Sequence, residues 1–155
     1  MIDVKDLRYG NIVTLNNPKH WAELKGVPLK VVGVAERVDS KGNDTFTVSL
    51  EIIDSFKEKY GRYAEYSINQ FMKYVEPIAI TEDLLPKIGF ELDWKSKYTI
   101  KYSHKEFAKF GYDWGVDDGW KFRYYGHYFK CDFFHQIQNK YYELSEPQQE
   151  LKIEL

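Results

Sequence analysis

The sequence predicts an α+β fold, with a small antiparallel β-unit over residues 1–80 and an aromatic-rich antiparallel sheet packed by one C-terminal helix over residues 81–155. Short apolar or alternating runs separated by turn residues fill the first part. Aromatic residues make up 17% of the chain and gather in its second half. Apolar residues recur at helical spacing near the C-terminus. A chain of 155 residues suits two small domains, with one continuous domain as the alternative.

Three strands are predicted near the N-terminus, at residues 11–15, 27–38 and 45–52. The second is rich in valine, and the third alternates apolar with hydroxyl side chains, as a strand with one buried face does. The polar connection between them contains Gly42, which can adopt the positive φ of a tight hairpin.

The remainder of the first part is predicted to hold a polar loop at 54–63, a short helical turn near Ser67 and a strand at 74–80. Several short strands with frequent turns favour a small, strongly bent sheet. We therefore predict an SH3-like β-unit for residues 1–80.

A short helix is predicted to follow, starting at Thr81 as N-cap and stopping at Gly89. Pro86 limits it to a turn or two, because proline removes a backbone hydrogen bond inside a longer helix.

The second part is predicted to be an antiparallel meander. Residues 97–102 alternate lysine or threonine with apolar side chains, and residues 120–131 form two short strands joined near Gly126. The intervening segment 111–120 is acidic and rich in turn residues.

The C-terminal helix is predicted at residues 133–144, capped by Asp132, with one apolar stripe along it. Its His-Gln-Ile-Gln-Asn run, residues 135–139, places Gln136 and Asn139 on the solvent-facing side and His135 and Gln138 near the border of that stripe. We interpret the border residues as structural, hydrogen-bonded to neighbouring backbone, with contact with a partner as the alternative. A terminal strand is predicted at 150–155.

Charge is unevenly distributed along the chain. The whole chain has a net charge of −2, whereas residues 95–142 carry nine basic and five acidic side chains, a net of +4. Basic and aromatic residues together are typical of nucleic-acid surfaces. The candidate contact residues, for a partner or for nucleic acid, are Lys97, Lys101, Lys121, Arg123, Tyr125 and Lys130.

The alternation of side chains along two segments predicts which of the candidate residues share a face. On 97–102 the tyrosines and lysines fall on opposite faces, so the rings are expected to be buried while the lysines face water. On 121–125, Lys121, Arg123 and Tyr125 are expected to share a face, which leaves room for a patch.

Metal binding is considered for His127, Cys131 and His135, which lie four residues apart. Gly126 and Asp132 interrupt any continuous helix, and no paired ligand motif supplies a fourth ligand. The acidic residues at 113, 117 and 118 lack the order of a calcium loop. We therefore expect no metal and no cofactor.

Catalytic motifs are absent from the sequence, which has no phosphate-binding glycine loop, nucleophile elbow or zinc-protease motif. Cys131 with His135 or His127 as base is the remaining option. A lone cysteine among aromatic residues more often behaves as a small hydrophobe, so we expect a protein that is not an enzyme.

Cellular location is inferred from the N-terminal residues and from the length of the apolar runs. Residues 1–13 lack the basic start and apolar run of a signal peptide. No stretch approaches the ~18 apolar residues of a membrane helix. We expect a cytoplasmic protein without a membrane partner.

Three blocks of the chain resemble the landmarks of a family of small uncharacterised proteins of Bacteroidetes-type bacteria, their phages and their mobile elements. The blocks are LRYGNIV, VEPIAITEDLLPKIGFE and FHQIQNKYYELSEPQQEL. The family pattern is LRxGN, EPIxLTExxLxKxGF and HQxQNxYxxL. The matching residues are Asn11, Pro77, Thr81, Leu84, Gly89, Phe90, His135, Gln136, Gln138, Asn139 and Leu144. Pro86 and the Ser-Glu-Pro turn near the C-terminus depart from it.

The resemblance implies a context, that of a phage or mobile-element accessory protein in a bacterial host cell, and not an activity. Proteins of that origin are often stoichiometric inhibitors of host defence, such as anti-CRISPR proteins. We expect a non-enzymatic protein that binds a host protein or ribonucleoprotein. The alternative is a nucleic-acid- or nucleotide-binding module that uses the surface of residues 95–130.

Overall fold

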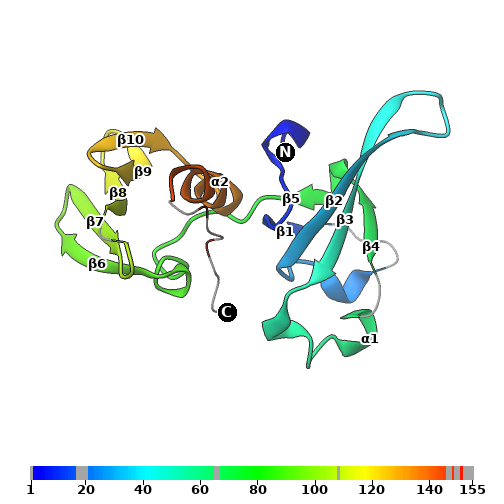
Figure 1. Ribbon diagram of the computed structural model, residues 1–155, viewed down its shortest axis with the longest axis horizontal. Coiled ribbons are helices and arrows are strands. Elements are labelled where there is room, and N and C mark those ends of the chain that lie inside the picture. Colours follow the sequence, from blue (N-terminus) through cyan, green and yellow to red (C-terminus); the bar gives the residue numbers. More distant parts are fainter. Residues whose placement is uncertain are drawn as a thin grey trace. The chain divides into compact units, whose positions relative to one another are not determined.

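The computed structural model describes residues 2–16, 21–64, 67–107, 109–145, 148 and 151. The chain divides into two compact units, Met1–Ile78 and Ala79–Leu155. The described residues form two five-stranded antiparallel sheets and a C-terminal helix (Figure 1), which confirms the α+β class.

The first unit holds one antiparallel sheet with the strand order β4-β3-β2-β1-β5. Its strands are β1 (Ile12–Leu15), β2 (Leu29–Val38), β3 (Asp44–Ile52), β4 (Ile68–Phe71) and β5 (Val75–Glu76). The strands expected from the sequence at 11–15, 27–38 and 45–52 are confirmed. The helical turn expected near Ser67 is wrong, because β4 occupies that position and a 3-10 helix (Met72–Tyr74) follows it.

The hairpin between β2 and β3 forms as its turn residues predict. Gly42 has a φ of 82°. The Asp39 carboxylate accepts the backbone N–H groups of Lys41 at 2.8 Å and Asn43 at 2.9 Å, which closes the turn. Figure 1 shows the long two-stranded ribbon that results.

The core of the first unit is aliphatic. Val13, Leu29, Val31, Val48 and Leu50 are fully buried, because they alternate with polar residues on β1 to β3. The segment expected to be a polar loop contains a 3-10 helix (Asp54–Phe56) and helix α1 (Gly61–Ala64). Partly buried rings pack against this core: Trp21, Phe46, Phe56, Tyr60 and Tyr63.

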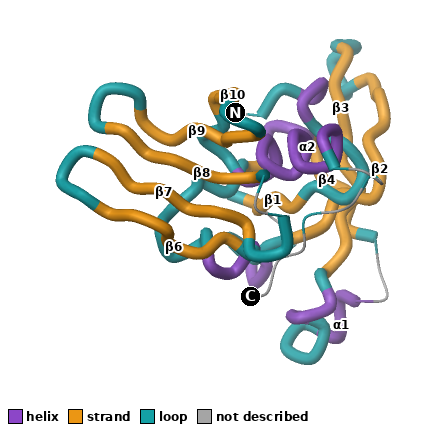
Figure 2. Tube along the Cα trace, turned by 60° about the vertical axis from the view of Figure 1, so that its left-hand side comes forward, coloured by secondary structure: helices purple, strands orange, loops and turns teal. Residues whose placement is uncertain are grey.

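The second unit is a meander whose strands follow one another in the sheet. They are β6 (Phe90–Lys95), β7 (Thr99–His104), β8 (Phe110–Gly115), β9 (Gly119–Tyr124) and β10 (His127–Lys130), in sequential order. Figure 2 shows β6 to β9 side by side. The turn-rich interpretation of 111–120 is wrong, because residues 111–115 belong to the central strand β8, residues 119 and 120 begin β9, and only residues 116–118 turn.

Helix α2 (Phe134–Leu144) covers one face of this sheet. The Tyr141 ring lies 4.8 Å from that of Phe110 on β8 and 5.2 Å from that of His104 on β7. The expected capping by Asp132 is wrong. The Gln136 carbonyl oxygen instead accepts the backbone N–H groups of Asp132 and Phe133, which satisfies two free donors at the helix start.

The segment before β6 is a turn followed by a 3-10 helix (Pro86–Ile88). Thr81 Oγ1 accepts the Leu84 N–H at 3.3 Å, as expected of an N-cap. Pro86 stands at the first position of the 3-10 helix, where its missing N–H costs nothing. Gly89 ends the helix with a φ of 86°, as predicted. The strand expected at 150–155 lies outside the described residues, apart from the buried Leu151.

Helices that could cross a bilayer were sought among the described residues, and none is long and apolar enough to do so.

His104 is buried among rings on the α2 side of the sheet. Its ring lies 5.1 Å from that of Phe90 and 5.7 Å from that of Phe107. Its Nδ1 accepts the Glu106 N–H at 3.3 Å, so this nitrogen carries no proton. Burial lowers the pKa of His104, and Lys105 adds to this while Glu106 opposes it.

We predict that lowering the pH from 7 to 5 destabilises the second unit through His104. Because the folded state holds the pKa of His104 below its usual 6.5, the unfolded chain binds more protons in this window. The free energy of unfolding therefore falls as the pH drops below about 6.5, by about 1.4 kcal/mol for each unit of pKa difference. Urea unfolding of the wild type and of His104→Phe at both pH values measures it. An equal loss in both proteins contradicts the assignment.

Candidate functional site

The candidate site is the face of the second sheet that α2 does not cover, called here the open face. Strand register places Lys101 opposite Asp113, Asp113 opposite Lys121, and Lys121 opposite Lys130, in one row across four strands. The neighbouring row on the other face joins Tyr102, Tyr112 and Phe122, all buried. Successive residues of a strand point to opposite faces, so buried rings and charged groups separate.

Four of the six residues expected at a contact surface come together on the open face: Lys101, Lys121, Arg123 and Lys130. The other two do not. Lys97 lies in the turn between β6 and β7, with its ammonium 5.4 Å from the centre of the Tyr98 ring. Tyr125 lies in the turn between β9 and β10, with its ring 4.8 Å from that of Tyr124.

The expectation that Tyr125 shares a face with Lys121 and Arg123 is wrong. Strand β9 ends at Tyr124, and the chain reverses through Tyr125 and Gly126, whose φ values are 46° and 82°. Positive φ at both positions is typical of a two-residue hairpin turn, in which the strand alternation no longer applies.

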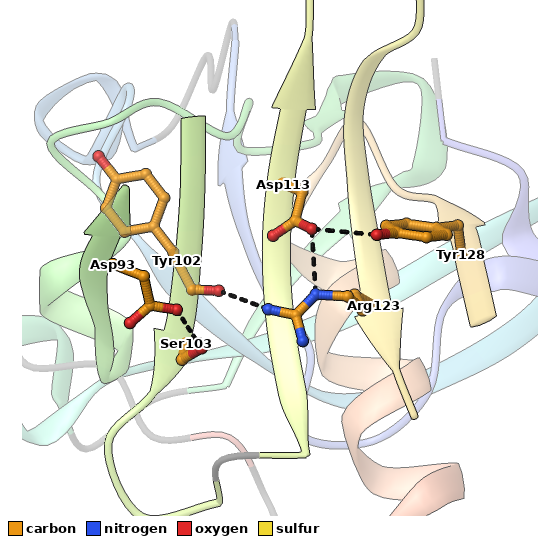
Figure 3. Close-up of polar contacts among 6 residues, drawn as sticks. All are labelled: Asp93, Tyr102, Ser103, Asp113, Arg123 and Tyr128. Carbon is orange, nitrogen blue, oxygen red and sulfur yellow. Dashed lines mark hydrogen bonds and ion pairs between the residues drawn. The ribbon is translucent and has the colours of Figure 1, made fainter. Parts of the chain in front are cut away.

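An ion pair lies at the centre of the open face (Figure 3). Arg123 Nε donates to Asp113 Oδ2 at 3.0 Å, and the Tyr128 hydroxyl donates to the same oxygen at 3.4 Å. The Asp113 side chain is only 10% exposed. A buried carboxylate of this kind depends on its hydrogen-bonded partners.

Gly111 makes this ion pair possible. A Cβ at residue 111 would lie 2.3 Å from Arg123 Nη2, so only glycine lets the guanidinium lie across β8. The same Nη2 lies 3.5 Å from the carbonyl oxygen of Tyr102 on β7. Arg123 therefore links β9 to β8 through its ion pair with Asp113. Its side chain is only partly accessible to a partner.

One oxygen of Asp113 is left without a donor. Asp113 Oδ1 is buried and has no hydrogen-bond partner among the residues that the structure describes. In Figure 3 the dashed lines from Arg123 and Tyr128 both reach the other oxygen. Buried acceptors are normally satisfied, so this oxygen marks a place where an additional donor would be favourable.

The lysines of the row are more accessible than Arg123. Lys121 Nζ lies 3.0 Å from Asp118, and Lys130 Nζ lies 3.5 Å from Asp132. Lys101 is exposed and forms no ion pair within the described part of the chain. Surface ion pairs contribute little energy, so these ammonium groups can exchange their partners for an anionic ligand.

Two exposed rings stand at the ends of the open face. Tyr128 on β10 is 52% exposed, and Trp94 on β6 is 59% exposed and paired with Lys101. The prediction that the rings on residues 97–102 are buried is confirmed for Tyr102 and is wrong for Tyr98, which is exposed. Trp94 was not among the expected contact residues, because no strand was predicted over residues 90–95, where a bulge between Leu92 and Trp94 interrupts the alternation.

A hollow of about 220 Å³ opens on this face. The row of Thr99, Gly115 and Gly119 borders it, and two of these three residues have no side chain. The other lining residues are Lys101, Asp113, Trp114, Asp118, Lys121 and Tyr128. The hollow exists because glycines replace side chains beside the charged row.

The residues considered for metal or catalysis do not form a site. His127 is exposed on β10, whereas Cys131 and His135 are buried. Groups of three potential metal ligands were sought among the described residues, and none was found. Burial raises the pKa of the Cys131 thiol to about 12, which keeps it protonated and weakly nucleophilic. Asp117 and Asp118 lie in the turn after β8, and Asp118 lines the same hollow as Asp113.

Comparisons with models of protein families, with curated proteins and with solved structures find no match to this chain.

We predict that Gly111→Ala lowers the free energy of unfolding of the second unit by about 1–3 kcal/mol, the cost of leaving a buried polar group unsatisfied. The added methyl group would push Arg123 away from Asp113. Gly115→Ala is the matched control on the same strand, since its Cβ would meet only Asp118 Cβ, at 3.8 Å. We expect a change within about 0.5 kcal/mol for the control. Urea unfolding followed by tryptophan fluorescence compares them, and equal stability of both variants contradicts the role of Gly111.

Proposed function

We propose that this chain is a non-enzymatic accessory protein of a phage or mobile element that binds and inhibits a host defence complex in the bacterial cytoplasm. Inhibition is stoichiometric, by occupation of a surface on that complex. The open face of the second sheet is the contact surface. The preferred partner is an RNA-guided nuclease, whose guide or target strand makes contacts that a cationic surface can displace.

The observation that carries this proposal is the row of Lys101, Lys121 and Lys130 on the face of the sheet that α2 does not cover. Strand register holds these cations in fixed positions, and the buried ring row behind them supports the sheet. Because Arg123 neutralises the Asp113 carboxylate in the same row, the three lysines can contact an anionic macromolecular surface. The resemblance to phage and mobile-element proteins supports the defence context.

The first unit supports a binding protein in a different way. We propose that it is an SH3-like barrel, in keeping with its strand order β4-β3-β2-β1-β5 and with the 3-10 helix (Met72–Tyr74) before its last strand. Small barrels of this kind present loops and short edges for binding.

A second candidate is a self-sufficient nucleic-acid-binding module. The exposed rings of Trp94 and Tyr128 beside the lysine row favour it, because bases stack on rings while cations contact phosphates. This candidate needs no protein partner, and it predicts binding to bare nucleic acid that weakens steeply with salt.

We predict that titrating the chain into the cleavage reaction of a purified RNA-guided nuclease from a Bacteroidetes-type host stops cleavage at about one chain per complex. Because a binder acts by occupancy, the endpoint scales with nuclease concentration. Lys101→Glu combined with Lys121→Glu should weaken inhibition about tenfold or more, since like charges then face each other. Lys97→Glu, in the turn, is the matched control and should inhibit as the wild type does.

Two outcomes contradict the proposal. Complete inhibition at a small fraction of one chain per complex would indicate an enzyme. Tight, salt-sensitive binding to bare RNA or DNA, with no effect on any defence nuclease, would favour the second candidate.

A further inference from the structure

The hollow on the open face combines three kinds of group in one place. Lys101 and Lys121 flank it with ammonium groups, Tyr128 contributes an exposed ring, and Asp113 contributes a carboxylate. Gly115 and Gly119 leave the space between them empty of side chains. A cationic pair, a ring and an acceptor are the groups that bind the phosphate, the base face and the base edge of a nucleotide.

We propose that this hollow is the binding site for one nucleotide of a single-stranded nucleic acid. Its phosphate contacts Lys101 on β7, its base extends toward β10 and stacks on Tyr128, and an N–H group of the base donates to Asp113. This inference rests on the proposed use of the open face as a contact surface, and it names the part of the partner that the face holds.

The charge balance of the hollow favours a nucleotide over a bare anion. Lys101 and Lys121 carry two positive charges, Asp113 and Asp118 carry two negative charges, and all four line the hollow. A simple anion would meet two carboxylates there. A nucleotide carries a negative phosphate at one end and N–H donors at the other, so it complements both kinds of group.

Asp113 supplies an independent observation. Its side chain is nine-tenths buried, it lines the hollow, and its Oδ1 has no hydrogen-bond partner among the described residues. Its Oδ2 is already bound by Arg123 and Tyr128, which holds the carboxylate in place. The carboxylate is therefore held in one orientation before a nucleotide binds.

The open face also has room for a strand on either side of the hollow. Trp94 and Tyr128 stand on β6 and β10, the two outer strands of the sheet. Four strand spacings of about 4.8 Å separate them by about 19 Å. A short single strand can thus cross the sheet along the lysine row and stack at both ends.

The test is fluorescence anisotropy with labelled ten-residue single-stranded RNA and DNA of mixed sequence, at low salt. The decisive variant is Gly115→Val, which fills the hollow and keeps every charge and ring. We expect it to weaken binding by about fivefold to a hundredfold, the value of one stacked base. Tyr128→Leu should weaken binding similarly. Tyr125→Leu, which removes an exposed ring from the turn, should bind as the wild type does.

Folding controls distinguish the loss of the binding site from misfolding of the variant. Gly115→Val must show the circular dichroism spectrum and unfolding midpoint of the wild type. If it does not, Gly115→Ala replaces it, because its Cβ makes only ordinary contact. Wild-type affinity in a folded Gly115 variant overturns the inference.

The outcomes also separate this inference from the proposed function. If the wild type binds neither oligonucleotide and still inhibits a defence nuclease, the nucleotide site is wrong while the inhibitor proposal stands. If it binds oligonucleotides through the hollow and inhibits no nuclease, the site is right and the inhibitor proposal is wrong. The RNA and DNA arms show which sugar the hollow accepts.

Discussion

The register of the five-stranded sheet is the constraint on which the second unit depends. One row across its strands joins Tyr102, Tyr112 and Phe122, and the next row joins Lys101, Asp113 and Lys121. Because the side-chain period of a strand is two, a slip of one residue would bury the charges and expose the rings. The ring row is buried on the face that α2 covers, and this apolar burial fixes the register. The position of the charged row is therefore a consequence of the core behind it.

Glycines beside this charged row determine the shape of the open face. Gly111 gives Arg123 room to lie across β8 and neutralise Asp113, and Gly115 with Gly119 leaves a hollow beside the lysines. Glycine in a strand weakens it, because it packs no side chain. The weakness is offset here by the ion pair between β8 and β9. The glycines that lower the local stability of the sheet thus also form the hollow that can hold a ligand.

The sequence predicted the alternation on residues 99–102 and the C-terminal helix, because both follow one uninterrupted period. It failed at β8, where Gly111, Gly115 and the aspartates have the composition of a turn, although the glycines instead make room for neighbouring side chains. It misplaced Tyr125 and missed Trp94 as well. A hairpin turn and a bulge break the period at these positions, and only the strand pairing locates them.

The central claim is that the two faces of the second sheet differ in access to water, with rings enclosed on one and cations presented on the other. Solution NMR with a neutral, soluble paramagnetic chelate tests it directly, since the chelate broadens signals near the surface. The account predicts strong broadening for the side chains of Lys101, Lys121 and Tyr128, and sharp ring signals for Tyr112 and Phe122. Ring signals of Tyr112 and Phe122 broadened as much as those of Tyr128 would contradict it.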